Sequence, residues 1–463
     1  MKLRTHALLA AALVSAPGWS QDFSLTSTTI AQMWKQDAPG FDKATFTPAT
    51  QYLGIDVTNL YRDEISLHLF GWGRADLGDA SMPNGSKSSG ELTYGYVSYR
   101  FKEANAEIKA GRFTVNQGVA IEQVDGASFR ADLVGGFTVS AFGGRPVLYK
   151  VRDYVSNKDY DYQRDVIAGF RVGLRVPKFG EFGVSYLVDG TKPAKDLPIP
   201  SATDYTREQV GLDLRIAPVA SFDLSGRTVL DVADHTETAA TRANKPSKIA
   251  EHDYAATFRI NGSWALTGAY TQRNYYAFFA GTNLPTLFRQ DEKDKFRAFG
   301  GSVVYGGGGP VEVVADYRHT TRDAFGDSNR FGATLRWNLE KQKIQTGFSY
   351  HRVTTDDATL VDPARPAFGL SHHEARAWAM AERGRLFGSV DAIVQRYDDE
   401  KNPYLNGKPN LFETVASLGV SLSMNAKLSG DLSYATNPLF KKDVRGLLRL
   451  EYRFVSARKG AGK

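Results

Sequence analysis

The sequence predicts an all-β chain that closes into a transmembrane, antiparallel up-and-down β-barrel of about 22 strands, within bounds of about 20 and 24. Three observations support this prediction. Apolar and polar residues alternate in many segments of roughly nine to eleven residues, the length that a tilted membrane strand requires. Turn signals separate these segments. Beyond residue 20 the chain has no run of about 18 apolar residues, so we expect no helix that crosses a membrane.

The first 20 residues have the order of charged, apolar and small residues that is typical of a secretory signal peptide. Lys2 and Arg4 precede the apolar residues 7–14, and Gly18 and Ser20 follow. We expect cleavage after Ser20, with a buried N-terminal helix as the alternative interpretation. Removing 20 of the 463 residues leaves 443, or about 20 for each of 22 strands with its share of loop. No residues then remain for a plug domain inside the barrel.

Individual strands can be recognised by their period of two. In residues 170–176, apolar side chains alternate with Arg171, Gly173 and Arg175, and residues 210–216 and 331–339 repeat the pattern. Because successive side chains of a strand point to opposite faces, each segment has one face suited to lipid and one suited to water.

Residues 115–162 are harder to divide into strands. We expect one additional hairpin there, with strands at residues 124–131 and 137–143 and a turn at residues 133–136. This hairpin raises the number of segments from 20 to 22. Either number is even, so both ends of the barrel domain, residues 21–454, would lie on the periplasmic side.

Short and long connections alternate along the chain, as they do in barrels with periplasmic turns and extracellular loops. Tyrosine and tryptophan are expected near the strand ends, because girdles at the membrane surface favour side chains with an apolar body and a polar tip. The aromatic residues assigned to these girdles are Tyr94, Tyr96, Tyr99, Trp264, Tyr270, Tyr275, Tyr276, Trp337, Tyr350, Tyr397, Tyr452 and Phe454.

The last strand is expected at residues 444–454, where Arg445, Arg449, Glu451 and Arg453 occupy every second position of an otherwise apolar run, apart from Leu447. The alternating apolar residues that end in Leu450, Tyr452 and Phe454 resemble the terminal-strand signature of bacterial outer-membrane proteins. The resemblance implies that the barrel assembly machinery reads this strand. The basic residues 455–463 that follow are expected to form a disordered periplasmic tail.

A second resemblance concerns residues 110–146. Gly111-Arg112 closes one strand pattern, Asp125-Gly126 opens the next, and Phe142 and Pro146 follow. This arrangement is similar to that of alginate-export-type porins and related barrels of medium size. It implies a porin-like protein without indicating a substrate.

If the apolar faces contact lipid, the opposite faces line the interior of the barrel. A charge on the lipid face would cost about 2–4 kcal/mol for Arg or Lys at mid-bilayer, which favours this orientation. The expected pore-lining residues are Arg112, Arg171, Arg175, Arg215, Arg227, Arg259, Arg297, Arg318, Arg336, Arg445, Arg449, Asp213 and Asp316. Their arginine excess favours anionic or sugar-like solutes. The alternative is that these charges form cross-strand ion pairs along a wet wall.

A long loop could narrow the interior. Residues 146–165 are the first candidate, with Arg145, Lys150, Arg152 and Asp153 available to line a constriction, and residues 115–123 are the second. A surface loop is the alternative interpretation of both.

No motif indicates catalysis. The chain has no cysteine, no Gly-x-Ser-x-Gly elbow and no phosphate-binding loop, and the adjacent His372 and His373 would point to opposite faces of a strand. We therefore predict no enzyme activity, no metal site, no cofactor and no nucleic-acid partner. The predicted function is passive diffusion of small hydrophilic solutes through the bacterial outer membrane. Two alternatives remain: a barrel that houses a multihaem cytochrome, as in porin-cytochrome conduits, and a surface adhesin.

Overall fold

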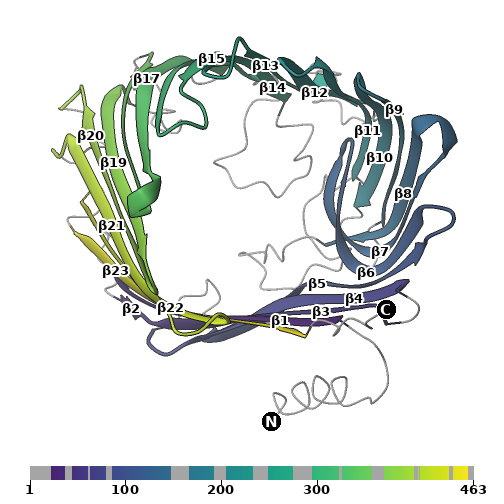
Figure 1. Cartoon of the computed structure of the whole chain (residues 1–463), viewed down its shortest axis with the longest axis horizontal. Helices are drawn as coiled ribbons and strands as arrows, with labels where there is room; N and C mark the ends of the chain where they lie inside the picture. The colour runs from purple at the N-terminus through teal and green to yellow at the C-terminus, as the bar shows by residue number, and fades with distance from the viewer. Residues whose placement is uncertain are drawn as a thin grey trace, which may run out of the picture.

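One antiparallel sheet closes on itself to form a wide ring (Figure 1). The computed structural model describes residues 22–36, 44–60, 63–79, 86–147, 166–191, 205–232, 249–274, 295–322, 326–356, 370–400, 405, 407–436 and 442–456. The barrel closes because β1 (Asp22–Gln36) pairs with β3 (Pro48–Thr58) along one edge and with β23 (Asp443–Ser456) along the other. The short strand β2 (Ala44–Phe46) pairs only with the end of β1, so the wall of the barrel has 22 strands. The predicted fold class and strand number are confirmed.

Each remaining strand pairs with its neighbours in sequence order. The first group comprises β4 (Ile65–Asp76), β5 (Ser88–Phe101), β6 (Ala106–Gln117), β7 (Ala120–Asp132), β8 (Phe137–Pro146), β9 (Val166–Val176), β10 (Gly180–Thr191), β11 (Tyr205–Val219), β12 (Phe222–Asp231) and β13 (Ile249–Arg259). The second group comprises β14 (Trp264–Asn274), β15 (Lys295–Tyr305), β16 (Val311–Arg322), β17 (Gly326–Leu339), β18 (Ile344–Thr355), β19 (His372–Arg383), β20 (Leu386–Tyr397), β21 (Asn410–Ser421) and β22 (Ala426–Thr436).

The additional hairpin predicted between residues 124 and 143 is present as β7 and β8, joined by a 3-10 turn at Val134–Gly136. Phe23 pairs with Ser456, so the two ends of the described chain meet at one end of the barrel. The short turns, such as the one between β9 and β10, lie at this same end. The predicted signal peptide and residues 457–463 of the predicted tail lie outside the described residues.

The outer face of the barrel is apolar along the last strand. Leu448 is 54% exposed, and Leu450, Tyr452 and Phe454 on the same face are also exposed. Leu448 pairs with Ala31 of β1, whereas the alternating Arg449 faces the interior and lies 3.7 Å from Asp431. The two-faced character predicted for this strand is therefore confirmed. No helix within the described residues is long and apolar enough to span a membrane.

Aromatic side chains gather on the outer face near the short-turn end. Trp264 contacts Tyr305 with ring centroids 4.8 Å apart, and Trp337 and Tyr452 are exposed on the same outer surface. The prediction was wrong for Tyr94, Tyr96 and Tyr397, whose side chains face the interior. Tyr275 and Tyr276 lie outside the described residues.

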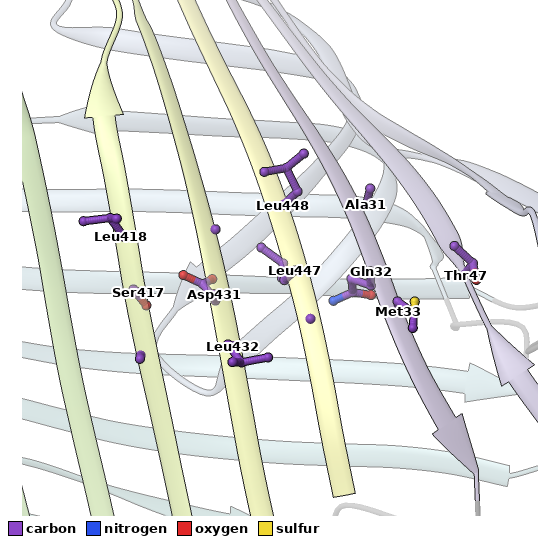
Figure 2. Close-up of a pocket in the computed structure, with 13 residues that line it drawn as sticks. Ala31, Gln32, Met33, Thr47, Ser417, Leu418, Asp431, Leu432, Leu447 and Leu448 are labelled. Atoms are coloured by element: carbon purple, nitrogen blue, oxygen red, sulfur yellow. The ribbon is translucent and has the colours of Figure 1, made fainter.

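A shallow apolar groove of about 600 Å³ crosses β21, β22, β23 and β1 (Figure 2). Small residues, including Gly430 and Gly446, leave space between exposed leucines such as Leu418 and Leu432. These residues belong to the outer face, since Gly430 pairs with Leu448. The groove therefore faces lipid and is separate from the interior.

Candidate functional site

Strand register places most of the predicted pore-lining residues on the inner face of the barrel. Arg171, for example, alternates with Phe170 and Val172, which are exposed on the outer face. The residues on the inner face are Arg171, Arg175, Arg215, Arg227, Arg259, Arg318, Arg336, Arg445, Arg449, Asp213 and Asp316.

Arg297 is a correction to this set. It pairs with Gln272 and shares the outer face with the exposed Phe299, whereas Phe296 and Ala298 face inward. The prediction failed because the inner face of β15 carries apolar residues at this end of the strand, so that alternation gives no clear polar side.

Arg112 lies where β6 separates from β5. Gly95 is its pairing partner, and no residue beyond Arg112 pairs with β5. Its guanidinium donates hydrogen bonds to Asp125 at 2.7 and 2.8 Å and to the carbonyl oxygen of Leu92 at 2.9 Å. Arg112 therefore connects both neighbouring strands at the point of separation.

Most of the inner arginines form ion pairs with carboxylates on neighbouring strands. Arg171 donates to Asp213 at 2.5 and 3.0 Å and to Glu181 at 3.1 Å, and Arg336 donates to Glu312 at 2.6 Å. These contacts agree with the alternative interpretation of the charges as cross-strand pairs. Among the described residues, Arg259 and Arg318 form no ion pair. Arg318 is paired in register with a second arginine, Arg330, which makes this part of the wall locally positive.

Two carboxylate centres lie on the inner face: Asp316 belongs to the predicted pore-lining set, whereas Glu251 was not singled out in the sequence. Glu251 of β13 has a side chain that is only 1% exposed, and it lies 2.8 Å from Arg227 and 2.9 Å from Arg273. Asp316 contacts Arg330 at 2.8 Å and Nε2 of His351 at 3.0 Å. Arg227, Arg273 and Arg330 come from strands adjacent to that of their carboxylate, and His351 reaches Asp316 from two strands away. Register rather than sequence proximity therefore brings these groups together.

The hairpin of β6 and β7 extends beyond both of its neighbours. Pairing with β5 stops at Arg112, and pairing with β8 begins only at Val124. Residues 113–122 therefore pair with no strand outside the hairpin. Two glycines permit this path, because Gly111 (φ +128°) lies where the strand separates and Gly118 (φ +58°) forms the turn.

The tip of this hairpin docks on the inner face of β10 and β11. The backbone N–H of Val119 donates to Oγ of Ser185 at 2.9 Å, and Arg207 forms an ion pair with Glu122. Ser185 faces the interior, because the alternating Val184 is 49% exposed on the outer face. β7 is not adjacent to β10 in the sheet, so the hairpin must leave the wall and bend inward beside β10 and β11, as Figure 1 shows.

An apolar cluster holds the hairpin against the wall. Its buried members on the hairpin include Phe113, Val115 and Val119, and those on the wall include Ile167, Leu187, Val229 and Ala250. Burying side chains of this size stabilises a contact by about 1.5–3 kcal/mol each. A sequence signal was present: the wall strands have two successive apolar residues here, as in Val166-Ile167, so both faces are apolar.

The two candidates for a constriction have different outcomes. Arg145 belongs to β8, opposite Asp125, and is not a loop residue, which corrects the prediction. Lys150, Arg152 and Asp153 lie outside the described residues. Residues 115–123, the second candidate, form the docked hairpin.

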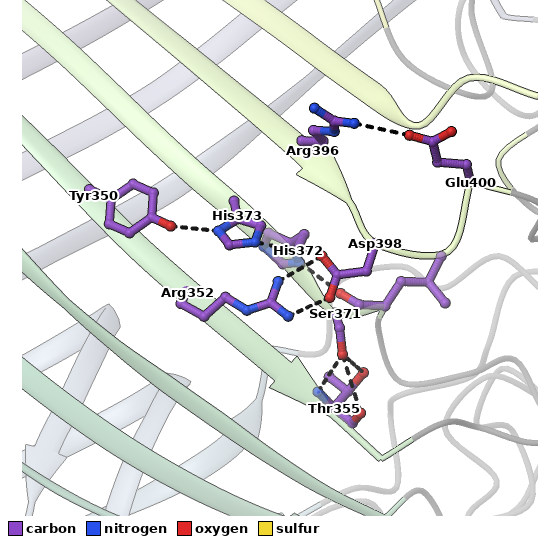
Figure 3. Close-up of polar contacts among 10 residues, drawn as sticks. Tyr350, Arg352, Thr355, Ser371, His372, His373, Arg396, Asp398 and Glu400 are labelled. Atoms are coloured by element: carbon purple, nitrogen blue, oxygen red, sulfur yellow. Dashed lines mark hydrogen bonds and ion pairs between the residues drawn. The ribbon is translucent and has the colours of Figure 1, made fainter.

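At the opposite end of the barrel from the short turns, a polar cluster joins β18, β19 and the residues after β20 (Figure 3). Arg352 binds Asp398 through both terminal nitrogens, one of them at 2.8 Å, and Tyr350 lies 2.5 Å from Nδ1 of His373. Oγ of Ser371 accepts the backbone N–H of Thr355 at 2.9 Å. These contacts fix the start of the connection that follows β20.

A pH dependence follows from this cluster. Hydrogen bonds from the Arg352 guanidinium hold the pKa of the Asp398 carboxyl below its ordinary value of 3.8. A lowered pKa contributes stability that is present above pH 3.8 and is lost as the pH falls through the folded-state pKa. We expect Asp398→Asn to lower the melting temperature at neutral pH. The difference in melting temperature between this variant and wild type should shrink as the pH falls below 3.8.

Thermal unfolding as a function of pH tests this expectation. Glu400→Gln is the control, because its partner Arg396 is well exposed and such surface pairs contribute little. If the difference in melting temperature between wild type and Asp398→Asn stays constant down to a pH of about 3, the stabilising role of the ionised Asp398 is contradicted.

No protein-family model and no curated protein matches this sequence. Several solved structures are similar in shape. OccK5 (OpdH) of Pseudomonas aeruginosa has 10% identity and a TM-score of 0.42, over 94% of this chain and 98% of that one. OccAB2 of Acinetobacter baumannii has 12% identity and a TM-score of 0.43, over 95% and 99%. The translocation pore of the P pilus usher PapC has 11% identity and a TM-score of 0.43, over 94% and 99%.

The assignment of the fold depends on this chain's own strand pairing and surface. A sheet that closes on itself leaves no unpaired edge, and here it presents an apolar outer face and a charged inner face. The chain is a closed antiparallel β-barrel with 22 strands in its wall.

Proposed function

We propose that this protein is an outer-membrane channel through which small hydrophilic solutes, anionic or sugar-like, diffuse passively. The observation that carries the proposal is the hairpin of β6 and β7, which belongs to the chain itself and lies against the charged inner wall. Such a hairpin reduces the interior without filling it with a separate domain. Rings of charge around a narrowed passage select solutes by sign and size.

The same observation favours a channel over a sheath for a cytochrome partner. A sheath needs inner surface that is complementary to a protein, and apolar patches commonly serve that purpose. In this barrel the apolar inner patch around Leu187 and Val229 is covered by the chain's own hairpin.

Conductance in a planar bilayer tests the proposal. The refolded protein is expected to give stable, ohmic channels, with a reversal potential under a salt gradient that indicates anion preference. Arg318→Ser should reduce that preference, because Arg318 adds positive charge on the inner face without an ion-pair partner among the described residues.

Arg297→Ser is the matched control, since Arg297 lies on the outer face and its loss should leave the reversal potential unchanged. A correctly folded barrel that gives no current would contradict the channel. Equal shifts of the reversal potential in the two variants would contradict the role of Arg318 in anion preference.

A further inference from the structure

Four aromatic side chains on neighbouring strands face the interior of the barrel. We call Tyr52, Phe70, Tyr94 and Tyr96 the aromatic band. Phe70 pairs in register with Tyr94, and Tyr96 pairs with His68. The alternating residues Leu53 and Val97 are exposed on the outer face, which places the band on the inner one.

The rings stack on one another in a contiguous row. Tyr52 and Phe70 have centroids 6.3 Å apart with planes inclined by 18°, and Phe70 and Tyr94 have centroids 5.5 Å apart with planes inclined by 19°. Tyr96 continues the band, 6.1 Å from Tyr94, and stacks on His68 at 4.9 Å. The stacked rings form a row of aromatic side chains that crosses three strands.

The band is half-buried, not enclosed, and polar groups border it. Asp56 lies 2.7 Å from Nδ1 of His68 and accepts a hydrogen bond from Ser24 at 3.4 Å. A carboxylate has further lone pairs, so Asp56 can also accept hydrogen bonds from a ligand. At its far end, Tyr96 contacts Phe113, at the base of the docked hairpin, with centroids 6.5 Å apart. The band therefore leads to the part of the interior that the hairpin narrows.

We propose that the aromatic band is a binding surface for the pyranose rings of oligosaccharides; this inference rests on the proposed channel function and names its substrate class. The C–H face of a pyranose ring is flat and weakly polar, so it stacks on an aromatic face, while hydroxyl groups at its rim donate to acceptors such as Asp56. An aromatic carboxylate would also stack, but the charge of Asp56 disfavours it.

Maltohexaose and cellohexaose, added to single channels in a planar bilayer, provide the test. At least one of them is expected to interrupt the current reversibly, with a frequency that rises with its concentration. Tyr94→Leu combined with Phe70→Leu should raise the half-blocking concentration at least about tenfold, equivalent to about 1.4 kcal/mol. Leucine retains apolar volume and removes the aromatic face, together with the hydroxyl group of Tyr94.

Two controls separate stacking from other effects. Tyr94→Phe keeps the face and should block as wild type does. Tyr270→Leu removes an aromatic ring from the outer face and should also behave as wild type. Sorbitol, a polyol without a ring, should cause no interruptions. A conducting channel that neither oligosaccharide blocks would overturn the inference, as would equal block of wild type and the double variant.

The inference can fail separately from the channel function. If the folded barrel carries no current, saturation-transfer NMR of the same oligosaccharides with the barrel in detergent still tests the band. Magnetisation transfer from the protein to the sugar C–H protons that is lost in the double variant would support binding at the aromatic band. If the wild-type protein transfers no magnetisation to these protons, the inference is overturned.

Discussion

Val119→Cys combined with Gly211→Cys is expected to join the β6–β7 hairpin to the barrel wall by a disulfide that forms spontaneously on refolding. The chain has no cysteine of its own, so any disulfide must come from the introduced pair. A Cβ built at Gly211 lies 3.0 Å from Cβ of Val119 and 2.6 Å from Oγ of Ser185. A disulfide needs about 3.5–4.5 Å between Cβ atoms, so a small separation of the hairpin and a rotation of the Ser185 side chain suffice. Mass spectrometry of the unreduced digest would identify the linked peptides.

A matched pair keeps one cysteine and moves the other away. Val119→Cys with Thr267→Cys places the second thiol on the inner face of β14, away from β10 and β11, where the hairpin docks. It should remain reduced in the monomer. Equal yields of intramolecular disulfide in the two variants would contradict the docked position of the hairpin.

Glu251→Leu is expected to lower the free energy of unfolding by about 1.5–3 kcal/mol, because it leaves the guanidinium groups of Arg227 and Arg273 together without their shared carboxylate. The Glu251 side chain is almost completely buried, but those of Arg227 and Arg273 are 25% and 42% exposed, so water offsets only part of the loss. Urea unfolding of the barrel in lipid vesicles, followed by tryptophan fluorescence, would measure the difference.

Glu312→Leu is the comparison for this result. Its partner Arg336 has a side chain that is 59% exposed, and exposed pairs contribute about 0–1 kcal/mol. Similar losses in both variants would show that burial of the carboxylate does not determine the energetics of the inner wall.

The residue pattern alone determined the strands and their two faces. Alternation is a local property, since each side chain of a strand points away from its neighbours, and Leu448 and Arg449 could be assigned to lipid and interior without knowledge of their partners. The hairpin of β7 and β8 was predictable for the same reason. Where both sides of a strand are apolar, as around Arg297, the local pattern carries no such information.

Only the tertiary structure decided what the inner wall contains. Val119 and Ser185 are 66 residues apart, and Glu122 and Arg207 are 85 residues apart. Their contacts therefore depend on which wall strands the hairpin reaches when it bends inward. The aromatic band likewise combines rings from three strands. The sequence pattern assigned Tyr94 and Tyr96 to the girdle, whereas strand register shows that their side chains face the interior. Alternation predicts the face of a side chain, but closure of the sheet and strand register determine its neighbours, because these contacts join residues that are distant in sequence.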